Sequence, residues 1–533
     1  MPVVSRSMWA RMHEASEVRG GSRRAVGGSS LLRGTACIVA PGACRFHSRP
    51  GRRIAAEYGH RSSFRPRQPM TAQRPPGPSS AYFGIPLARR MFQDYVGFHQ
   101  WLHREHGDAV FMQLGRMRDY CFAHPDLVRE ALVEKGKSFI RWKYGMEVFS
   151  RAHGQSVLIT EGAVWQRQRR MLQPVFGPKR FDGYARQVVA GSAAALDALP
   201  VNQPVDFEHA MTMLTMDVIM RTMFSSEVPA EGVAASQAVR VLSRAGMKEM
   251  FLPFPIPQWV WLPWRPEANR ARATLDTLVW RFIRERQAAP GEHDDLLAML
   301  MSAADEEGDQ GRLDPQQIRD QCMTTFLAGH ETTATALTWW GWAMAAHPEI
   351  ARRAAQEVDA ALGGRSPVHA DLHHLPYLAQ TIKETLRMFP PAASLFTRQA
   401  IEDVQIGQWQ IPKGAMVLVT PYVLHHDPRW FDEPGRFDPE RFSPERAERI
   451  PRGAYLPFGL GPRVCIGSNF AAMEMALIAA MLLQRFEFRL LSGQPAPRPV
   501  LNVTLRPAEG MTLELRRRVP AASPAHAEEP APA

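Results

Sequence analysis

The chain has few cysteines and no long apolar run, and both shortages narrow the classes of protein to which it can belong. The 533 residues include five cysteines, an odd number, without a Cys-x-x-Cys pair or zinc-type spacing. This argues against a disulfide framework and favours a reducing compartment, the cytoplasm. No apolar run reaches the ~18 residues of a membrane-spanning helix, so we expect a soluble protein without a transmembrane anchor. The cysteines are Cys37, Cys44, Cys121, Cys322 and Cys465.

Acidic residues are scarce near the N-terminus, and this region carries almost all of the net charge. Residues 1–70 contain 13 arginines, no lysine and three glutamates, a net of +10 out of the +11 of the whole chain. The rest of the chain is therefore almost neutral. A basic surface is not expected on the folded body, and we predict no nucleic-acid partner.

The N-terminal region is rich in Arg, Gly and Ser, which predicts a disordered leader over residues 1–77. The same composition is typical of a transit peptide, and Met70 is an alternative start of the protein. Residues 519–533, mostly Pro, Ala and Glu, are expected to form a disordered tail. Residues 81–518 show no long linker and no internal repeat, so we expect one large domain there.

The pattern of this body is mainly helical. Residues 213–224 are apolar nearly all round, which is typical of a core helix. Asp314, Pro315 and Gln317 fit the N-cap, N1 and N3 positions of a helix that is expected to end before Pro348. Short β-like runs separated by Gly and Pro follow in residues 400–419. The sequence therefore predicts a mainly α domain with a small β region.

Residues 251–264 are strongly apolar, but their prolines forbid a regular helix. We predict a loop with aromatic anchors. Two interpretations of this loop stay open: a lid over a binding site, and plain packing against the following helix, predicted over residues 267–287.

Residues 458–467, FGLGPRVCIG, precede a helix-forming run and carry most of the chemical information. Because Cys465 lies just before a helix N-terminus, unpaired backbone N–H groups and the helix dipole are expected to lower its pKa and favour a thiolate. A soft thiolate among N–H donors suits iron. A dinucleotide-binding loop does not fit, since Pro462 interrupts the turn and Val464 occupies the third glycine position. A buried, inert thiol is the ordinary interpretation of a lone cysteine.

These ten residues match, position by position, the haem-binding cysteine signature of the cytochrome P450 family, and the chain resembles a haem-thiolate monooxygenase. The resemblance implies the P450 fold, with Cys465 as the axial ligand of the iron of haem b and Phe458, Gly459 and Gly467 beside the haem. It also implies insertion of one oxygen atom from O2 into an apolar substrate, such as a fatty acid or terpenoid. Electrons from NAD(P)H are expected to arrive through a separate ferredoxin and ferredoxin reductase, and the protein is expected to be a monomer.

Residues 328–333, AGHETT, bring small, acidic and hydroxyl side chains together within the long predicted helix. Such residues favour a local bend with an opened hydrogen bond. Alone, they indicate a polar patch satisfied by its own backbone. In the resembling family they form the oxygen-activation groove, which implies that Thr332 donates a hydrogen bond there and that Glu331 relays protons.

Glu384 and Arg387 share a helix face, but the same spacing recurs elsewhere in the chain at ordinary surface pairs. Their position between an apolar helix and the cysteine loop distinguishes them. With Arg441 they match the buried Glu-Arg-Arg triad of the resembling family, whose role is to hold the segment that carries the cysteine.

Trp165 and Arg169 match the Trp-x-x-x-Arg pair that touches the haem propionates in the resembling family. Arg398 and Arg463 are expected to add positive charge there, because two carboxylates need cationic donors before they can be buried. For Arg398, exposure to solvent stays an alternative.

The resemblance also suggests a roomy apolar substrate pocket, lined by Ala328, Ala392, Ala393 and Leu395. Two other functions stay open. One is a haem-thiolate enzyme of another class, such as a peroxygenase or an isomerase, although those relatives often lack the acid and threonine that Glu331 and Thr332 provide. The other is a non-enzymatic haem protein that senses or binds a gas.

Overall fold

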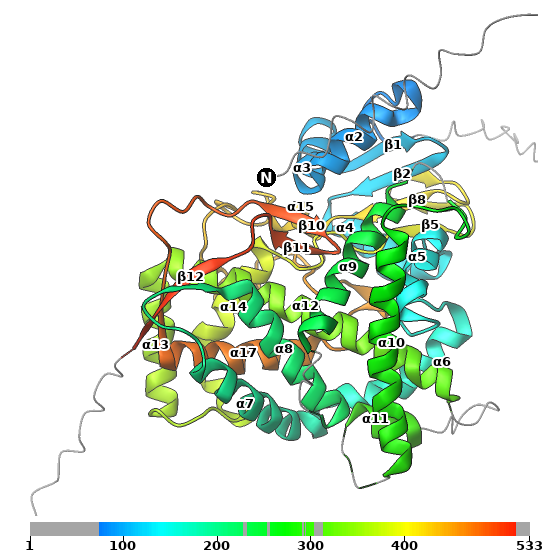
Figure 1. The fold of residues 1–533 in the computed structure, drawn as a ribbon. Coiled ribbons are helices and arrows are strands. Elements are labelled where there is room, and N and C mark those ends of the chain that lie inside the picture. The colour runs from blue at the N-terminus through cyan, green and yellow to red at the C-terminus, as the bar shows by residue number, and fades with distance from the viewer. Residues whose placement is uncertain are drawn as a thin grey trace, which may run out of the picture. The chain divides into compact units, whose positions relative to one another are not determined.

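A 32-residue helix, α12 (Pro315–Ala346), runs through the middle of the fold (Figure 1). Its start is the predicted one: the Asp314 carboxylate accepts from the backbone N–H of Gln317 at 2.8 Å, and the Gln317 side chain accepts from the backbone N–H of Asp314 at 3.1 Å. The helix ends at the predicted break, His347, because Pro348 cannot extend it. The two hydrogen bonds between Asp314 and Gln317 satisfy backbone N–H donors that the start of a helix otherwise leaves unpaired.

The computed structural model describes residues 74–226, 232–252, 256–289, 291, 293, 295–302 and 313–518. The predicted leader as far as residue 73 and the predicted tail lie outside these ranges. Two residues just before the predicted start of the domain contact the body: the Arg74 guanidinium lies over the Phe111 ring at 5.2 Å, and the Pro76 carbonyl accepts from the Phe111 N–H at 2.9 Å.

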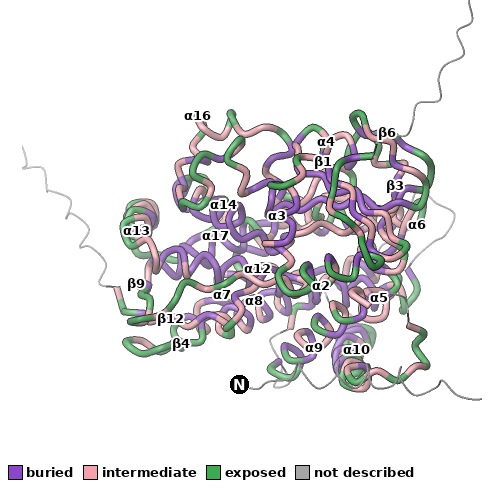
Figure 2. Tube along the Cα trace, turned by 90° about the horizontal axis from the view of Figure 1, so that it is seen from above, coloured by how far each residue is buried: buried purple, intermediate pink, exposed green. Residues whose placement is uncertain are grey.

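Other helices surround α12, and their inner faces are buried (Figure 2). The predicted core helix is α8 (Phe207–Phe224), which begins earlier than the apolar run and packs along α12. The remaining α-helices are α2 (Ile85–Gln93), α3 (Tyr95–His106), α4 (Pro125–Arg129), α5 (Lys143–His153), α6 (Gly162–Leu172), α7 (Phe181–Asp197), α9 (Gly232–Met250), α10 (Arg265–Ala288), α11 (Leu296–Ser302), α13 (Pro348–Leu362), α14 (Pro376–Met388), α15 (Pro421–His425), α16 (Pro444–Ala447) and α17 (Ser468–Arg485).

Short helical turns join many of these elements. They are η1 (Ala81–Gly84), η2 (Glu130–Glu134, a π-helical turn), η3 (Gly136–Ser138), η4 (Gln173–Phe176), η5 (Pro178–Arg180), η6 (His369–His374), η7 (Pro439–Phe442) and η8 (Gly461–Arg463). Within the described ranges, no helix is both long and apolar enough to cross a bilayer.

The predicted small β region is present, and it is larger than the sequence indicated. A five-stranded sheet has the order β1-β2-β8-β5-β3, a three-stranded sheet the order β4-β12-β9, and β6-β7 and β10-β11 are two-stranded. Residues 400–419 supply β6, β7 and β8 as predicted, whereas β2 was missed because charged residues interrupt its apolar pattern. The strands are β1 (Ala109–Leu114), β2 (Met117–Phe122), β3 (Phe139–Arg141), β4 (Pro204–Asp206), β5 (Arg398–Ala400), β6 (Val404–Ile406), β7 (Trp409–Ile411), β8 (Met416–Val419), β9 (Phe486–Arg489), β10 (Pro499–Asn502), β11 (Thr504–Pro507) and β12 (Thr512–Arg517).

The predicted proline-rich loop joins α9 to α10, and its residues 253–255 lie outside the described ranges. Trp259 and Trp261 are 85% and 71% exposed, so the prediction that aromatic side chains anchor the loop is wrong for these two. The end of the loop is held instead by Arg265, whose guanidinium donates to the buried Glu249 carboxylate at 2.6 Å.

Candidate functional site

Residues 458–467 form a tight loop that brings Cys465 to the start of α17. The backbone N–H of Cys465 donates to the Phe458 carbonyl at 3.0 Å and closes the loop. Gly461 has a φ of +78°, and a Cβ on it would lie 2.3 Å from the Leu132 carbonyl oxygen, so only glycine fits there. Cys465 is unpaired and lies in the wall of a cavity of about 630 Å³.

The helix end acts on Cys465 in the predicted direction, but the prediction that its pKa is lowered overall is wrong for the polypeptide on its own. Burial raises the pKa of this thiol, and it outweighs the Gly467 N–H and the Arg169 guanidinium, which both lower it. The exposed surface of Cys465 faces the cavity, and protein surrounds the sulfur on its other sides. A bound metal ion removes a thiol proton outright, so the thiolate needs a cation at the sulfur as well as the helix end.

Four arginines, called here the arginine group, line the same cavity. The Arg463 guanidinium lies 4.0 Å from the Trp165 ring centroid, pairs with Glu161 and donates to the Thr160 carbonyl at 3.0 Å. A nitrogen of Arg169 donates to the Val464 carbonyl at 2.8 Å, beside the cysteine. The members of the arginine group are Arg141, Arg169, Arg398 and Arg463.

The charge of the arginine group exceeds the charge that opposes it. Burial, together with neighbouring guanidinium groups, lowers the pKa of Arg141 to about 9 and that of Arg398 to about 10. Nε of Arg141 and Nη1 of Arg463 are buried and have no hydrogen-bond partner. Because buried donors are almost always paired, these nitrogens indicate an anion that binds between them.

The cavity therefore fits a haem. Its two propionates would meet the arginine group, and its iron would meet the Cys465 sulfur, the soft ligand that the loop presents. Trp165, Arg169, Arg398 and Arg463 come together as the sequence predicted, and Phe458, Gly459 and Gly467 also line the cavity. Arg141 was missed, because an arginine inside the short strand β3 gives no signal of its own.

Helix α12 forms another wall of the cavity, and Ala328, Glu331 and Thr332 lie on it. The Thr332 hydroxyl donates to the Ala328 carbonyl at 2.7 Å, one turn earlier. Helix α12 is unbroken through this stretch, and the local bend stays a prediction. A Cβ on Gly329 would lie 2.6 Å from the Ile219 side chain, so the glycine is explained by close packing of α12 on α8.

The comparisons with known proteins agree with this geometry. A sequence model of the family Cytochrome P450 matches residues 75–514. The chain belongs to the cytochrome P450 family. Cyclooctatin synthase of Streptomyces melanosporofaciens is 36% identical over 75% of this chain and 88% of its own. Cyclooctat-9-en-7-ol 5-monooxygenase of the same organism is 34% identical over 81% of this chain and 93% of its own. Pentalenene oxygenase of Streptomyces avermitilis is 30% identical over 78% of this chain and 91% of its own.

As a cytochrome P450, the protein is a haem-thiolate monooxygenase, an oxidoreductase that uses haem and O2. The predictions of family, fold class and type of reaction are confirmed. The roles of individual residues stay predictions, and the structure shows where each residue lies.

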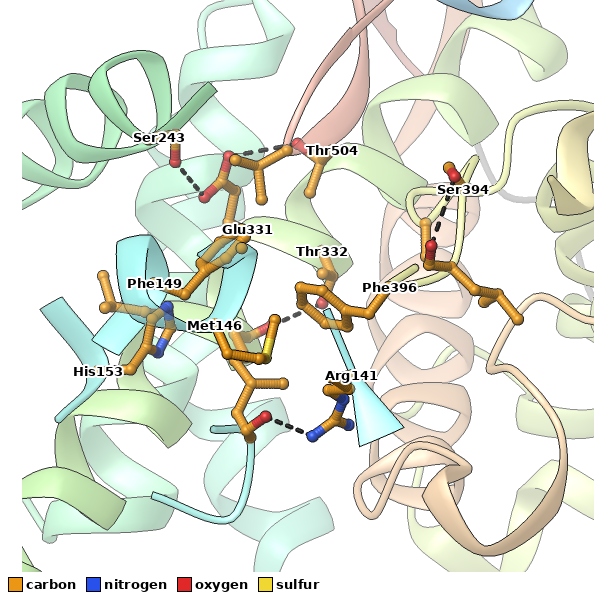
Figure 3. Close-up of a pocket in the computed structure, with 18 of the residues that line it drawn as sticks. Arg141, Met146, Phe149, His153, Ser243, Glu331, Thr332, Ser394, Phe396 and Thr504 are labelled. Atoms are coloured by element: carbon orange, nitrogen blue, oxygen red, sulfur yellow. Dashed lines mark hydrogen bonds between the residues drawn. The ribbon is translucent and has the colours of Figure 1, made fainter. Parts of the chain in front are cut away.

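Glu331 of this P450 is held by three partners. Its carboxylate accepts from Arg506 at 2.7 Å, from the Thr504 hydroxyl at 3.2 Å and from the Ser243 hydroxyl at 3.2 Å. Figure 3 shows Glu331 turned toward Ser243 and Thr504, whereas Thr332 is turned toward the side of Phe396. All three donors point at this one carboxylate, so Glu331 is arranged to accept hydrogen bonds.

The predicted triad is assembled and fully buried. Arg387 donates to Glu384 at 2.7 and 2.8 Å, and Arg441 donates to the same carboxylate at 3.2 Å. Arg387 also donates to the His425 carbonyl at 2.7 Å, and the His425 imidazole accepts from the Leu456 N–H at 2.8 Å. The triad is thereby connected to the chain just before the cysteine loop.

The substrate pocket is only partly the predicted one. Ala328, Ala392 and Leu395 line the cavity. Ala393 is a correction, because it lies fully buried in the main core and is not part of the lining. Larger apolar side chains, missed from the sequence, dominate the wall, and those that Figure 3 labels are Met146, Phe149 and Phe396.

Proposed function

We propose that this cytochrome P450 oxygenates an apolar substrate of the terpenoid class. The observation that carries the proposal is one cavity with Cys465 and the arginine group on its wall, the Thr332 turn beside them and an apolar lining beyond. Two relatives support the substrate class, since pentalenene is a terpene and cyclooctat-9-en-7-ol is an alcohol of the same class. Apolar, mostly preformed cavities favour apolar ligands of this size.

The residues of this chain would divide the work as follows. A haem bound through Cys465 supplies the activation of O2 and the transfer of one oxygen atom. The arginine group binds and orients the propionates, and the apolar wall excludes water from the reacting centre. The Thr332 hydroxyl, which now donates to the Ala328 carbonyl, can turn into the cavity and donate there. Glu331, held in place by Arg506, can accept from a water that resupplies Thr332 with a proton.

Substrate would enter beside the loop between α9 and α10. Phe251, Gln258 and Trp264 from this loop and its flanks line the cavity, which favours the lid interpretation over plain packing. Closing such a loop would remove the substrate from water before oxygen transfer begins.

Electrons are proposed to come from NAD(P)H through a ferredoxin and its reductase. Neither the fold nor the cavity provides a second redox centre within the described ranges. The three cysteines of the described ranges are unpaired, which suits a reducing cytoplasm. We take residues 81–518 as the monooxygenase domain and expect it to work as a monomer.

Reconstitution tests the proposal. The purified holoenzyme is mixed with NADPH, ferredoxin, ferredoxin reductase, a panel of cyclic terpenes and isotopically labelled O2. We expect one labelled oxygen atom in the product, and essentially no product when ferredoxin is left out. Product formed with hydrogen peroxide alone, and not with O2 and electrons, would instead favour the peroxygenase alternative.

A further inference from the structure

One side of the cavity is a sheet face that is apolar except for one acidic residue. Asp119 lies on β2 and lines the cavity. Its cross-strand neighbours are Met112 on β1 and Met416 on β8, which line the cavity with it. Leu114 and Leu418 continue the same sheet face. Figure 1 shows β2 away from α17, the helix that follows the cysteine loop.

The Asp119 carboxylate has no partner among the residues that the structure describes. The residue is only 7% exposed, and among the described residues its side chain makes no hydrogen bond and no ion pair. Burial alone raises the pKa of Asp119, to about 7. The Tyr95 hydroxyl, which comes from α3 above this face, donates at 2.9 Å to Ser394 instead. A carboxyl in such a place is costly unless a ligand or water bonds to it.

Several other buried carboxylates of this protein are paired with arginine, whereas Asp119 is not, and Glu474, which also lacks an arginine, accepts from the Thr333 hydroxyl at 3.1 Å. The arginine-paired examples are Glu249 with Arg265, Asp295 with Arg286, and Glu384 with Arg387. Those acids stabilise loops and helix ends, whereas Asp119 lines the cavity without such a partner. Packing does not explain an acid at this position, because a leucine would fill the sheet face without an unpaired polar group.

We propose that Asp119 determines substrate specificity by binding a hydroxyl group of the substrate, at the end that lies away from Cys465. This rests on the proposed function and deepens it: the substrate is a terpenoid alcohol. A hydroxyl can donate to the ionised carboxylate or accept from the neutral acid, so it bonds to either form. A hydrocarbon leaves the carboxyl unpaired, and a substrate carboxylate is repelled by the ionised form.

Ligands with one shared skeleton test the proposal. Dehydroabietane, dehydroabietinol and dehydroabietic acid carry a methyl, a hydroxymethyl and a carboxyl group, respectively, at the same ring carbon. Binding to the holoenzyme is measured by the change in the haem Soret band and, independently, by equilibrium dialysis. We expect wild type to bind the alcohol about tenfold more tightly than the hydrocarbon, because a buried polar group discriminates strongly against a ligand that leaves it unpaired.

Three variants isolate the side chain. Asp119→Leu should lose the preference for the alcohol and bind the hydrocarbon better, while Asp119→Asn should keep part of the preference and bind the acid better. Asp126→Asn removes an exposed acid on α4 that does not line the cavity, and it should bind the three ligands as wild type does. Haem content and thermal midpoint are measured for each, and Asp119→Leu is expected to be no less stable than wild type.

The outcomes separate this inference from the proposed function. If the ligands bind but the ratio of alcohol to hydrocarbon affinity is the same in wild type and Asp119→Leu, the inference is overturned and the terpenoid assignment stands. If wild type binds none of the three ligands and no cyclic terpene of the reconstitution panel, both fail together.

Discussion

Arg506 on β11 donates to Glu331 on α12 at 2.7 Å, and thereby connects the C-terminal strands of the domain to the helix that forms the wall opposite the cysteine loop. The same guanidinium donates to Glu208 at 3.1 Å and to the Thr504 hydroxyl at 3.1 Å. Arg506 is therefore the positive charge between the buried Glu331 carboxylate and the half-buried Glu208 carboxylate.

Arg506→Met should destabilise the protein by about 3 kcal/mol, because it leaves a buried carboxylate without its partner. The double variant Arg506→Met/Glu331→Gln should recover part of that loss, since the second change removes one unpaired charge. Thermal and denaturant unfolding measure both effects. Arg485→Met breaks the more exposed pair with Asp197 and serves as the control, with an expected loss of no more than ~1 kcal/mol. Equal losses at the two sites would contradict the account.

Thr332→Ala should lower the amount of product formed per electron and divert electrons to hydrogen peroxide. The substitution removes a proton donor but changes the shape of the cavity little, so haem content and substrate affinity should hardly change. Proton delivery of this kind contributes up to ~10²–10⁴-fold, and water can replace part of it. Thr325→Ala is the matched control, because Thr325 lines the same cavity on α12 and also donates to the carbonyl one turn earlier. If Thr332→Ala and Thr325→Ala formed the same amount of product per electron, Thr332 would have no role beyond that of an ordinary helix residue.

Glu474 on α17 should make stability depend on pH. Burial raises the pKa of this carboxyl to about 8, against the smaller opposing effect of a hydrogen bond from Thr333. The folded state therefore keeps a proton that the unfolded state releases above its pKa of 4.5, and the free energy of unfolding falls as pH rises between these values. Glu474→Gln removes this dependence. The free energy of unfolding of the variant, relative to that of wild type, should therefore rise by roughly 1.4 kcal/mol per pH unit in that window.

Thermal midpoints of wild type and Glu474→Gln, measured across the window, check the prediction. Glu487→Gln, an exposed glutamate on β9, should show no such trend. A constant difference between wild type and Glu474→Gln would mean that the carboxyl is ionised in the folded protein.

A chain that begins at Met70 should fold, bind haem and turn over like the full-length protein. This length keeps Arg74 and Pro76, which both contact Phe111 on β1. A chain that begins at Ala81 loses these contacts and should have a lower thermal midpoint. If the Met70 chain yields only protein without haem, the leader contributes to the folded body and the prediction is wrong.

Local signals made part of this site predictable from the sequence. The Cys465 loop, the capped start of α12 and the Glu384–Arg387 pair depend on residues close together in the chain, and the structure shows each of them where the sequence placed it. The direction of the Cys465 pKa was missed, because the helix end is a local effect whereas burial of the sulfur depends on the whole fold.

Long-range partners could not be predicted. Arg506 lies 175 positions after Glu331, and nothing near either residue indicates the other. In the sequence, Asp119 is one polar residue in a short segment of mixed polarity. Only the sheet register shows that it lies between two methionines of the cavity wall. Ala393 was misplaced for a related reason, because its neighbours in the chain line the cavity while its own side chain faces the core.

The absorption spectrum of the reduced, CO-bound protein tests the central claim that Cys465 is the axial ligand of the haem iron. Wild type should show the red-shifted Soret band of a thiolate ligand. Cys465→Ser should lose that band but keep some haem, because the arginine group still binds the propionates. Cys322→Ala, a buried cysteine on α12, should keep it. A Cys465→Ser protein that retained the red-shifted band would contradict the account.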